Sequence, residues 1–334
     1  MRTLVISDLH IGAGRGRDAL TDQAVVDALA AGIATADRLV LLGDVIELRQ
    51  GSLQDALAAA SRVLPQLVAG LGEGSEAVMV FGNHDHQLQL HQEALSQVEW
   101  MLSQNGARVR FDYPGIWLRD DVYAQHGHYL DRHTTTPAFE RVAAGLMARF
   151  LKLPVSEMSE PNDYERLLAP IYAWMFAISQ TSKREIDAAD GGGSARALKL
   201  IRESRHLKGL AVQTGLRSLL GTLNLAKLGP LSPDLSPEML RRSSLVAYGR
   251  VLETLGLRPH YALFGHSHRA GPLAGDDRSE WTVGGGIELL NTGCWVHESP
   301  DFMSEEPRDN PYRPGFAVEL DDDGPPRLIN LLDR

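Results

Sequence analysis

Nine side chains that can bind metal ions or transfer protons lie in short motifs along this sequence of 334 residues. They are carboxylates, imidazoles and one carboxamide: Asp8, His10, Asp44, Asn83, His84, Asp85, His126, His266 and His268. This donor set suits Mn, Fe, Zn or Ni and lacks the thiolates that structural zinc usually takes. The residue types therefore predict a metal centre, in which Asp44 is the candidate to bridge two cations about 3.5 to 4 Å apart.

Each motif follows a segment with the apolar pattern of a buried strand. We predict strands at 3–6, 38–42, 77–81, 108–111, 116–119, 122–125, 261–264, 281–283, 287–291, 316–320 and 327–331. The carboxyl ends of strands in an open α/β sheet form the crevice where ligands bind. Residues that are far apart in the sequence are therefore expected to meet there.

Every motif also has a simpler explanation when it is taken alone. Asp8-Leu9-His10 is a common chance pattern, Gly43-Asp44 suits a turn, and Gly82-Asn83-His84-Asp85 suits a turn followed by a helix cap. His126 suits a core position, and Gly265-His266-Ser267-His268 suits a surface turn. All five motifs in this order, each after a strand, favour one shared metal centre.

Helical periodicity separates the first strands and then dominates the middle of the chain. Helices are predicted at 18–34, 52–71 and 88–104, and further helices at 137–151, 163–180, 195–223 and 237–255. No convincing strand pattern interrupts the second group. We therefore predict an α/β catalytic core formed by residues 1–136 and 259–334, with an all-helical insertion at 137–258 that acts as a substrate-selecting lid.

The ordered motif set resembles that of the calcineurin-like metallophosphoesterase superfamily over residues 1–136 and 259–334. This resemblance implies a four-layer αββα sandwich, in which helices flank two mixed β-sheets, with two divalent metal ions at the sheet edge. It also implies that the first ion is bound by Asp8, His10, Asp44 and His268, and the second by Asp44, Asn83, His126 and His266.

The implied reaction is hydrolysis of a phosphomonoester or phosphodiester by metal-bound hydroxide, with Mn as the expected metal in vitro. Two cations lower the pKa of water, hold the phosphoryl oxygens and neutralise charge that develops during displacement. His84 is not needed as a ligand and is predicted to assist the leaving group. Asp85 resembles the carboxylate that orients this histidine, and a helix N-cap is its alternative role.

Departures from the common motifs bear on the subfamily. Gly43-Asp44-Val45-Ile46-Glu47 has Glu47 in place of a second aspartate, and Arg49 does not complete the motif of serine/threonine protein phosphatases. Residues 125–131 resemble an element of the UDP-2,3-diacylglucosamine pyrophosphatases, which usually carry arginine where this chain has His84. His84 at this position favours a general phosphodiesterase or phosphomonoesterase. A nucleotide-lipid pyrophosphatase, favoured by a basic amphipathic segment in the insertion, is the alternative function, ahead of a nuclease or a non-catalytic scaffold.

Several basic or apolar segments are candidates for substrate contact. Arg15 and Arg17 follow the first motif, and Arg132 and His133 follow the fourth, so these four are candidate phosphate-binding residues, with an ordinary exposed loop as the alternative. Basic residues recur every three residues over 196–208 and predict a basic amphipathic helix. This helix could contact a membrane peripherally or bind a nucleotide- or lipid-linked phosphate, and a solvated helix face is the alternative. The apolar stretch 167–178 suits an active-site cap, an acyl pocket or the insertion's own core.

Composition excludes several classes of protein. The net charge of −10 argues against a stable nucleic-acid complex, although residues 140–260 are net positive. A single cysteine, Cys294, excludes an intramolecular disulfide. The first residues lack the apolar region of a secretory signal, and 167–178 is too short to cross a bilayer, so a cytoplasmic protein without a transmembrane helix is expected. The oligomeric state stays open.

Overall fold

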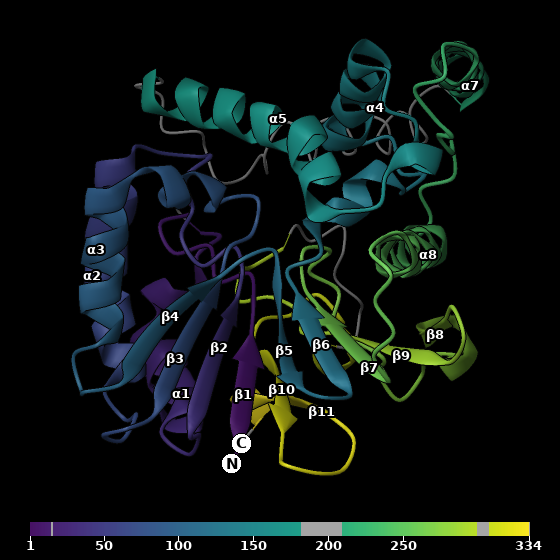
Figure 1. Cartoon of the computed structure of the whole chain (residues 1–334). Coiled ribbons are helices and arrows are strands. Elements are labelled where there is room, and N and C mark those ends of the chain that lie inside the picture. The colour runs from purple at the N-terminus through teal and green to yellow at the C-terminus, as the bar shows by residue number, and fades with distance from the viewer. Residues whose placement is uncertain (15, 182–208, 299–306, 334) are drawn as a thin grey trace.

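The computed structural model describes residues 1–14, 16–181, 209–298 and 307–333, which form two β-sheets between layers of helices (Figure 1). The larger sheet has the strand order β11-β10-β1-β2-β3-β4, and the smaller has the order β5-β6-β7-β9-β8. The strands are β1 (Thr3–Ile6), β2 (Arg38–Leu42), β3 (Glu76–Val80), β4 (Arg108–Asp112), β5 (Gly115–Arg119), β6 (Val122–Gln125), β7 (Tyr261–Phe264), β8 (Thr282–Val283), β9 (Ile287–Asn291), β10 (Phe316–Leu320) and β11 (Arg327–Asn330).

Both sheets are mixed. Strands β1 to β4 are parallel, whereas β10 pairs antiparallel with β1 and β11 pairs antiparallel with β10. In the smaller sheet β6, β7 and β9 are parallel, and β5 and β8 are antiparallel edge strands. The carboxyl ends of β1, β2, β3, β6 and β7 therefore point to the same edge of the sandwich, and this edge carries the predicted motifs.

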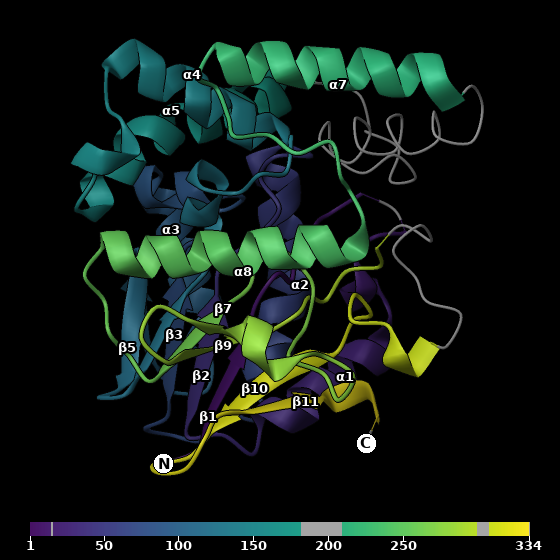
Figure 2. The ribbon, with the colours of Figure 1, turned by 90° about the vertical axis from the view of Figure 1, so that its right-hand side faces the viewer.

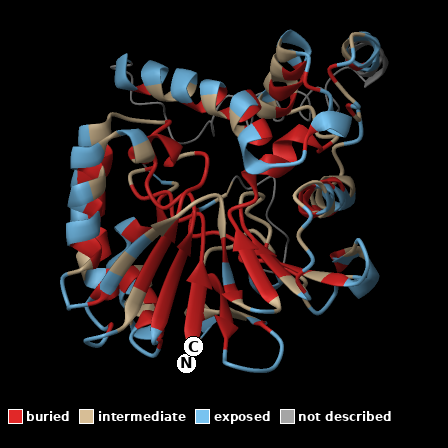
Figure 3. Cartoon of the chain, in the orientation of Figure 1, coloured by how far each residue is buried: buried red, intermediate tan, exposed pale blue. Residues whose placement is uncertain are grey.

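The central strands are buried on both faces, as Figure 3 shows. Val5, Val40 and Val78 lie in register on the inner face of the larger sheet and pack against Leu263 and Leu290 of the smaller sheet. Alternate residues of the same strands turn outward to the helices, because successive side chains of a strand point to opposite faces. This double burial explains why the strands are nearly continuous apolar runs in the sequence.

Helices complete the four layers. α1 (Gln23–Ile33), α2 (Leu53–Val68) and α3 (Gln92–Leu102) share one core cluster with the outer face of the larger sheet. α8 (Pro237–Thr254) covers the outer face of the smaller sheet, where the ring of Tyr248 stacks on Phe264 at 4.5 Å. These layers confirm the predicted αββα sandwich with two mixed sheets.

Between β6 and β7 the described residues form the helices α4 (Phe139–Leu151), α5 (Pro161–Thr181), α7 (Gly209–Leu225) and α8. α4 and α5 lie over the carboxyl ends of the strands (Figures 1 and 2). α8 instead belongs to the sandwich, because its buried side chains pack on the smaller sheet. The predicted basic helix at 196–208 lies outside the described residues. In the described part of the chain no helix is long and apolar enough to cross a bilayer.

Two helices begin later in the structure than the apolar periodicity predicts. The pattern over 18–34 divides into a 3-10 turn at Ala19–Thr21 and α1, because the Asp22 carboxylate caps α1 by accepting the backbone N–H of Ala24. The first residues of the predicted helix 88–104 belong to a 3-10 turn at His86–Leu90, and α3 follows this turn. Apolar spacing alone does not distinguish these short turns from an α-helix.

Candidate metal centre

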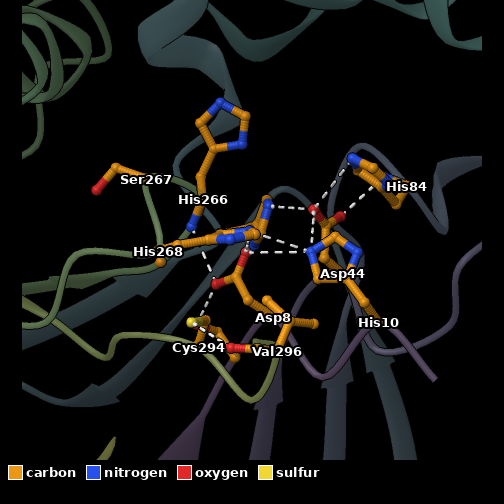
Figure 4. A network of polar contacts seen from close by, with 12 residues as sticks. Asp8, His10, Asp44, His84, His266, Ser267, His268, Cys294 and Val296 are labelled. Carbon is orange, nitrogen blue, oxygen red and sulfur yellow. Dashed lines mark hydrogen bonds and ion pairs between the residues drawn. The ribbon is translucent and has the colours of Figure 1, made fainter. Parts of the chain in front are cut away.

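The predicted motif residues meet at the carboxyl edge of the two sheets, where they follow β1, β2, β3, β6 and β7. Figure 4 shows the side chains of Asp8, His10, Asp44, His84 and His268 turned toward one another, with the ring of His266 farther up in the view. Asp8, Asp44 and His126 are nearly fully buried. Charged groups at such depth need opposite charges or a cation nearby.

The backbone is strained where the candidate ligands lie. Among the described residues that are not glycine, seven have a positive φ, and five of them are candidate ligands: Asp8, His10, Asp44, His266 and His268, with φ from 45° to 62°. Side chains other than glycine rarely adopt this left-handed conformation, and it costs free energy unless the surroundings enforce it. The concentration of strain at these positions is typical of a functional site.

The glycines that begin the motifs are required by close packing between motifs. A Cβ atom on Gly43 would lie 2.6 Å from Cβ of His126, and one on Gly265 would lie 2.8 Å from Cβ of Ser7. A Cβ atom on Gly82 would lie 2.6 Å from the backbone nitrogen of Asp44. The sequence signatures Gly-Asp, Gly-Asn and Gly-His thus have a steric cause, because each glycine allows one strand end to approach the next.

We expect Gly82→Ala to lower the free energy of unfolding by about 1–3 kcal/mol, because the added methyl group has to displace the backbone of Asp44. The same displacement should reduce metal content. Urea unfolding and metal analysis of the purified variant measure both effects. Gly275→Ala is the matched control, since its Cβ would have no neighbour within 4 Å. Equal stability of the two variants would contradict the packing argument.

The first donor set surrounds His268 and His10. His268 Nε2 lies 3.2 Å from Asp8 Oδ1 and 3.1 Å from His10 Nε2, and His10 Nε2 lies 3.7 Å from Asp44 Oδ2. Donors that bind one cation at about 2.0–2.2 Å lie about 3.0–3.5 Å from their neighbours in the same coordination shell. The spacing within this set is therefore close to that of a single coordination shell.

The second donor set surrounds His126. His126 Nε2 lies 3.2 Å from Asp44 Oδ2 and 3.2 Å from Asn83 Oδ1, and Asn83 Oδ1 lies 3.1 Å from His266 Nδ1. Asp44 Oδ2 is thus close to donors of both sets. This is the position that a carboxylate needs to bridge two metal ions.

Hydrogen bonds on the outer side of the imidazoles determine which nitrogen faces the centre. His10 Nδ1 donates to Glu47, His268 Nδ1 donates to Glu298, and His126 Nδ1 donates 2.9 Å to the carbonyl oxygen of Leu42. Each ring in its neutral form therefore directs the lone pair of Nε2 inward. Nearby, Asp8 Oδ1 is buried without a hydrogen-bond donor. Converging lone pairs and an unsatisfied carboxylate oxygen fit a site for cations.

Electrostatics of the buried groups point the same way. Burial lowers the pKa of His10, but the carboxylates of Asp8 and Glu47 outweigh it and raise the pKa to about 10. The same opposition, with Asp44 for His126 and Asp8 for His268, raises the pKa of each to about 9. Carboxylates at the centre thus demand positive charge, which protons or metal ions can supply.

Glu298→Gln should weaken metal binding about 10- to 100-fold, because Glu298 accepts the Nδ1 proton of His268 and pairs with Arg17. Burial raises the pKa of Glu298, but His268 outweighs it and lowers the pKa to about 2, so this carboxylate is charged at neutral pH. Titration against a chelator of known affinity measures the change. Glu288→Gln is the control, because Glu288 lies half-buried on β9 and its ion pair is with His260, not with a candidate metal ligand. Unchanged affinity for Glu298→Gln would show that the outer hydrogen bond is dispensable.

Asp85 is not placed as the sequence predicted. Its carboxylate accepts the backbone N–H groups of Gly82 and Val45, each at 2.7 Å, and so links the loops after β3 and β2. The carboxylate beside His84 Nδ1 is instead Glu47, at 2.8 Å. The residue next to His84 in the sequence turns away from the ring, whereas the residue that orients the ring comes from another loop.

The four candidate substrate-binding residues have different positions. Arg17 lines the cavity above the metal-ligand candidates, and Arg15 lies outside the described residues. Arg132 and His133 are buried and do not line this cavity; His133 Nε2 contacts the hydroxyl group of Tyr164 at 2.7 Å. Burial lowers the pKa of His133 to about 3. The turn after β6 directs both residues inward, which contradicts their expected contact with phosphate.

Three acidic residues of the site had not been assigned a role from the sequence: Glu47, Glu298 and Asp131. Glu47 contacts His10 and His84, Glu298 contacts His268, and Asp131 Oδ1 lies 3.1 Å from His266 Nε2. Glu298 lies beyond the turn that follows β9 (Ile287–Asn291), farther from its strand than the other motif residues are from theirs, so the rule that located those residues does not locate it. Glu47 stood out only as a departure from a motif.

Comparison with known proteins identifies the family of this chain. The family model of the calcineurin-like phosphoesterases matches residues 1–270. A dimetal phosphatase from Danio rerio is 11% identical with a TM-score of 0.38, and the similarity covers 99% of each chain. No curated protein matches. The chain belongs to the calcineurin-like phosphoesterase family and is a metal-dependent phosphoester hydrolase.

Proposed function

We propose that this protein hydrolyses a phosphomonoester or a phosphodiester at a centre of two divalent cations. The observation that supports this most directly is the pair of donor sets that share Asp44 Oδ2. The first cation would be held by Asp8, His10, Asp44 and His268, and the second by Asp44, Asn83, His126 and His266.

The metals that suit these donors are Mn, Fe, Zn or Ni, and we propose Mn for assays in vitro. The single cysteine takes no part, because Cys294 Sγ faces the carbonyl oxygens of Val296 and Tyr312 at 3.7 Å. Two bound cations would make hydroxide available near neutral pH and neutralise charge on the phosphoryl group. The other steps depend on side chains of the chain itself.

We assign His84 to the leaving group. Both Glu47 oxygens lie 2.8–2.9 Å from His84 Nδ1, so Glu47 orients the ring and leaves Nε2 toward the cavity, 3.9 Å from Asp44 Oδ2. Burial lowers the pKa of His84, and Glu47 and Asp44 oppose this effect. A protonated ring with a lowered pKa gives its proton readily to an alkoxide.

Glu47 also connects this histidine with the metal-ligand candidates. The same carboxylate accepts the Nδ1 proton of His10 at 3.0 Å. The rings of His10 and His84 lie 4.5 Å apart, edge to face. One carboxylate thus supports the orientation of both a metal ligand and the proposed acid, which couples their positions.

We further propose that α4 and α5 act as a lid over this centre. Arg49, two residues after Glu47, donates to Glu140 of α4 at 2.7 Å, and Ser179 of α5 donates to the carbonyl oxygen of Leu48 at 2.7 Å. These bonds attach both helices to the loop that carries Asp44. Contact with a membrane, a nucleotide-linked substrate and a cytoplasmic location remain proposals from the sequence.

The experiment that tests the function combines metal analysis with hydrolysis of bis-p-nitrophenyl phosphate and p-nitrophenyl phosphate in the presence of Mn. We expect two metal ions per chain and turnover that a chelator abolishes and Mn restores. The ratio of diester to monoester turnover identifies the preferred ester. A protein that binds no metal and hydrolyses neither compound would refute the proposal.

A further inference from the structure

A cavity of about 880 Å³ extends from the metal-ligand candidates to the helices above them. At its lower end it is lined by His10, His84, His266 and His268, and its upper wall comes from α4, α5 and α8. This volume lies at the upper end of the usual range for small-molecule sites. A phosphoryl group at the metals would therefore leave most of the cavity for the organic part of the substrate.

The upper wall is predominantly apolar. The side chains that matter here are Phe139, Val142, Trp174, Ile178, Leu240 and Leu245. They come from three helices that are separated in sequence, so the apolar surface is assembled by the tertiary structure. Polar groups gather at the metal end, and a molecule with one charged end and one apolar end matches this distribution.

Two aromatic rings on this wall are exposed although they are large. Phe139 is 40% exposed and Trp174 is 57% exposed, and their rings stack at 5.8 Å between centroids. Exposed apolar surface in a cavity is stabilised when a ligand covers it, because apolar area is then removed from water. The stacked pair thus offers an apolar surface that an apolar group of the substrate can cover.

The cations on the wall are already paired with carboxylates. Among the described lining residues there are four arginines, and each has an acidic partner: Arg17 with Glu298, Arg49 with Glu140, Arg241 with Glu280 and Arg269 with Asp276. A second phosphate group would have to compete with these carboxylates for the guanidinium groups. An uncharged organic group meets no such competition.

We infer that the substrate is a phosphoester whose organic group is large, uncharged and apolar, and that Phe139 and Trp174 bind that group. This inference rests on the proposed function, because it places the phosphoryl group at the metal centre. The apolar wall then contributes to substrate selection through the area that it buries.

The test compares p-nitrophenyl methyl phosphate with p-nitrophenyl hexyl phosphate, two diesters with the same leaving group. We expect kcat/KM to be about 10- to 100-fold higher for the hexyl ester, because additional methylene groups are buried against the wall. In Phe139→Ala and Trp174→Ala this ratio should fall severalfold. Phe150→Ala is the matched control, because Phe150 also lies on α4, is 82% exposed and does not line the cavity.

Equal kcat/KM for the two esters in the wild type would overturn this inference and leave the proposed function intact. A high ratio that Phe139→Ala and Trp174→Ala do not change would overturn the assignment of the binding wall. If neither diester is hydrolysed, turnover of p-nitrophenyl phosphate and metal analysis decide the proposed function separately, and calorimetry with hexyl phosphate and methyl phosphate decides the inference. Binding of hexyl phosphate at least about tenfold tighter supports it; equal binding, or tighter binding of UDP than of hexyl phosphate, overturns it.

Discussion

Asp44→Asn should lower kcat/KM for bis-p-nitrophenyl phosphate by about 10²–10⁴-fold, because it removes the charged oxygen that both donor sets share. The substitution keeps the shape of the side chain and an oxygen that can still accept the backbone N–H of His84 at 2.7 Å. Its amide nitrogen would point toward the inward lone pairs of His10 or His126. Repulsion between that nitrogen and a cation should lower metal content below two ions per chain.

Metal analysis and steady-state kinetics on the same preparation measure both parts of this prediction. Asp120→Asn is a suitable control. Asp120 lies in an exposed turn between β5 and β6, so this substitution removes the same charge at a distance from the site. A thermal melt of each variant separates loss of metal from loss of the fold. An Asp44→Asn protein with two metal ions and wild-type turnover would contradict the bridging role.

His84→Ala should slow hydrolysis by about 10²–10⁴-fold when the leaving group is an alkoxide, and much less when it is p-nitrophenolate. An alkoxide needs a proton as it departs, whereas p-nitrophenolate is stable as an anion. His84 lines the cavity, and Glu47 contacts Nδ1 of its ring, which leaves Nε2 as the nitrogen that can give a proton to the substrate. The dependence on the leaving group is therefore the signature of a proton donor.

Metal content distinguishes the role of His84 as a proton donor from a role as a metal ligand, which the geometry also permits. His84 Nε2 lies 3.9 Å from Asp44 Oδ2, and His10, Asp44 and His84 together could hold an ion. We expect His84→Ala to retain two metal ions, and His260→Ala, at an exposed site, to behave as wild type. Loss of a metal ion, or an equal loss of rate for both leaving groups, would assign His84 to the metal instead.

Most strands could be predicted from the sequence, because strands buried on both faces are short apolar runs with breakers at their ends. Every predicted strand is present, with boundaries that agree within a residue or so. The motif residues could also be located, since local sequence places each of them directly after a strand. The rule that parallel strands present their carboxyl ends at one edge brings together the motifs within each sheet. The packing of the two sheets brings the motifs after β6 and β7 to those after β1, β2 and β3.

The partners of these residues could not be predicted in the same way. Asp85 is adjacent to His84 in the sequence, yet it binds the backbone of Gly82 and Val45, whereas Glu47 from another loop contacts the ring. The direction of a side chain in a tight turn depends on backbone angles that the packing of neighbouring loops determines. Arg132 and His133 were misplaced for the same reason.

The sequence by itself determined the order of the strands along the chain, the nine side chains after the strands that can bind metal ions or transfer protons, and the glycines that precede several of them. Only the tertiary structure decided that α8 is a layer of the sandwich and that α4, α5 and α8 line a cavity above the site. Chemical type and periodicity are local properties that can be recognised within a few residues. The outer hydrogen bonds and the cavity depend on contacts between distant segments, which exist only after the chain has folded.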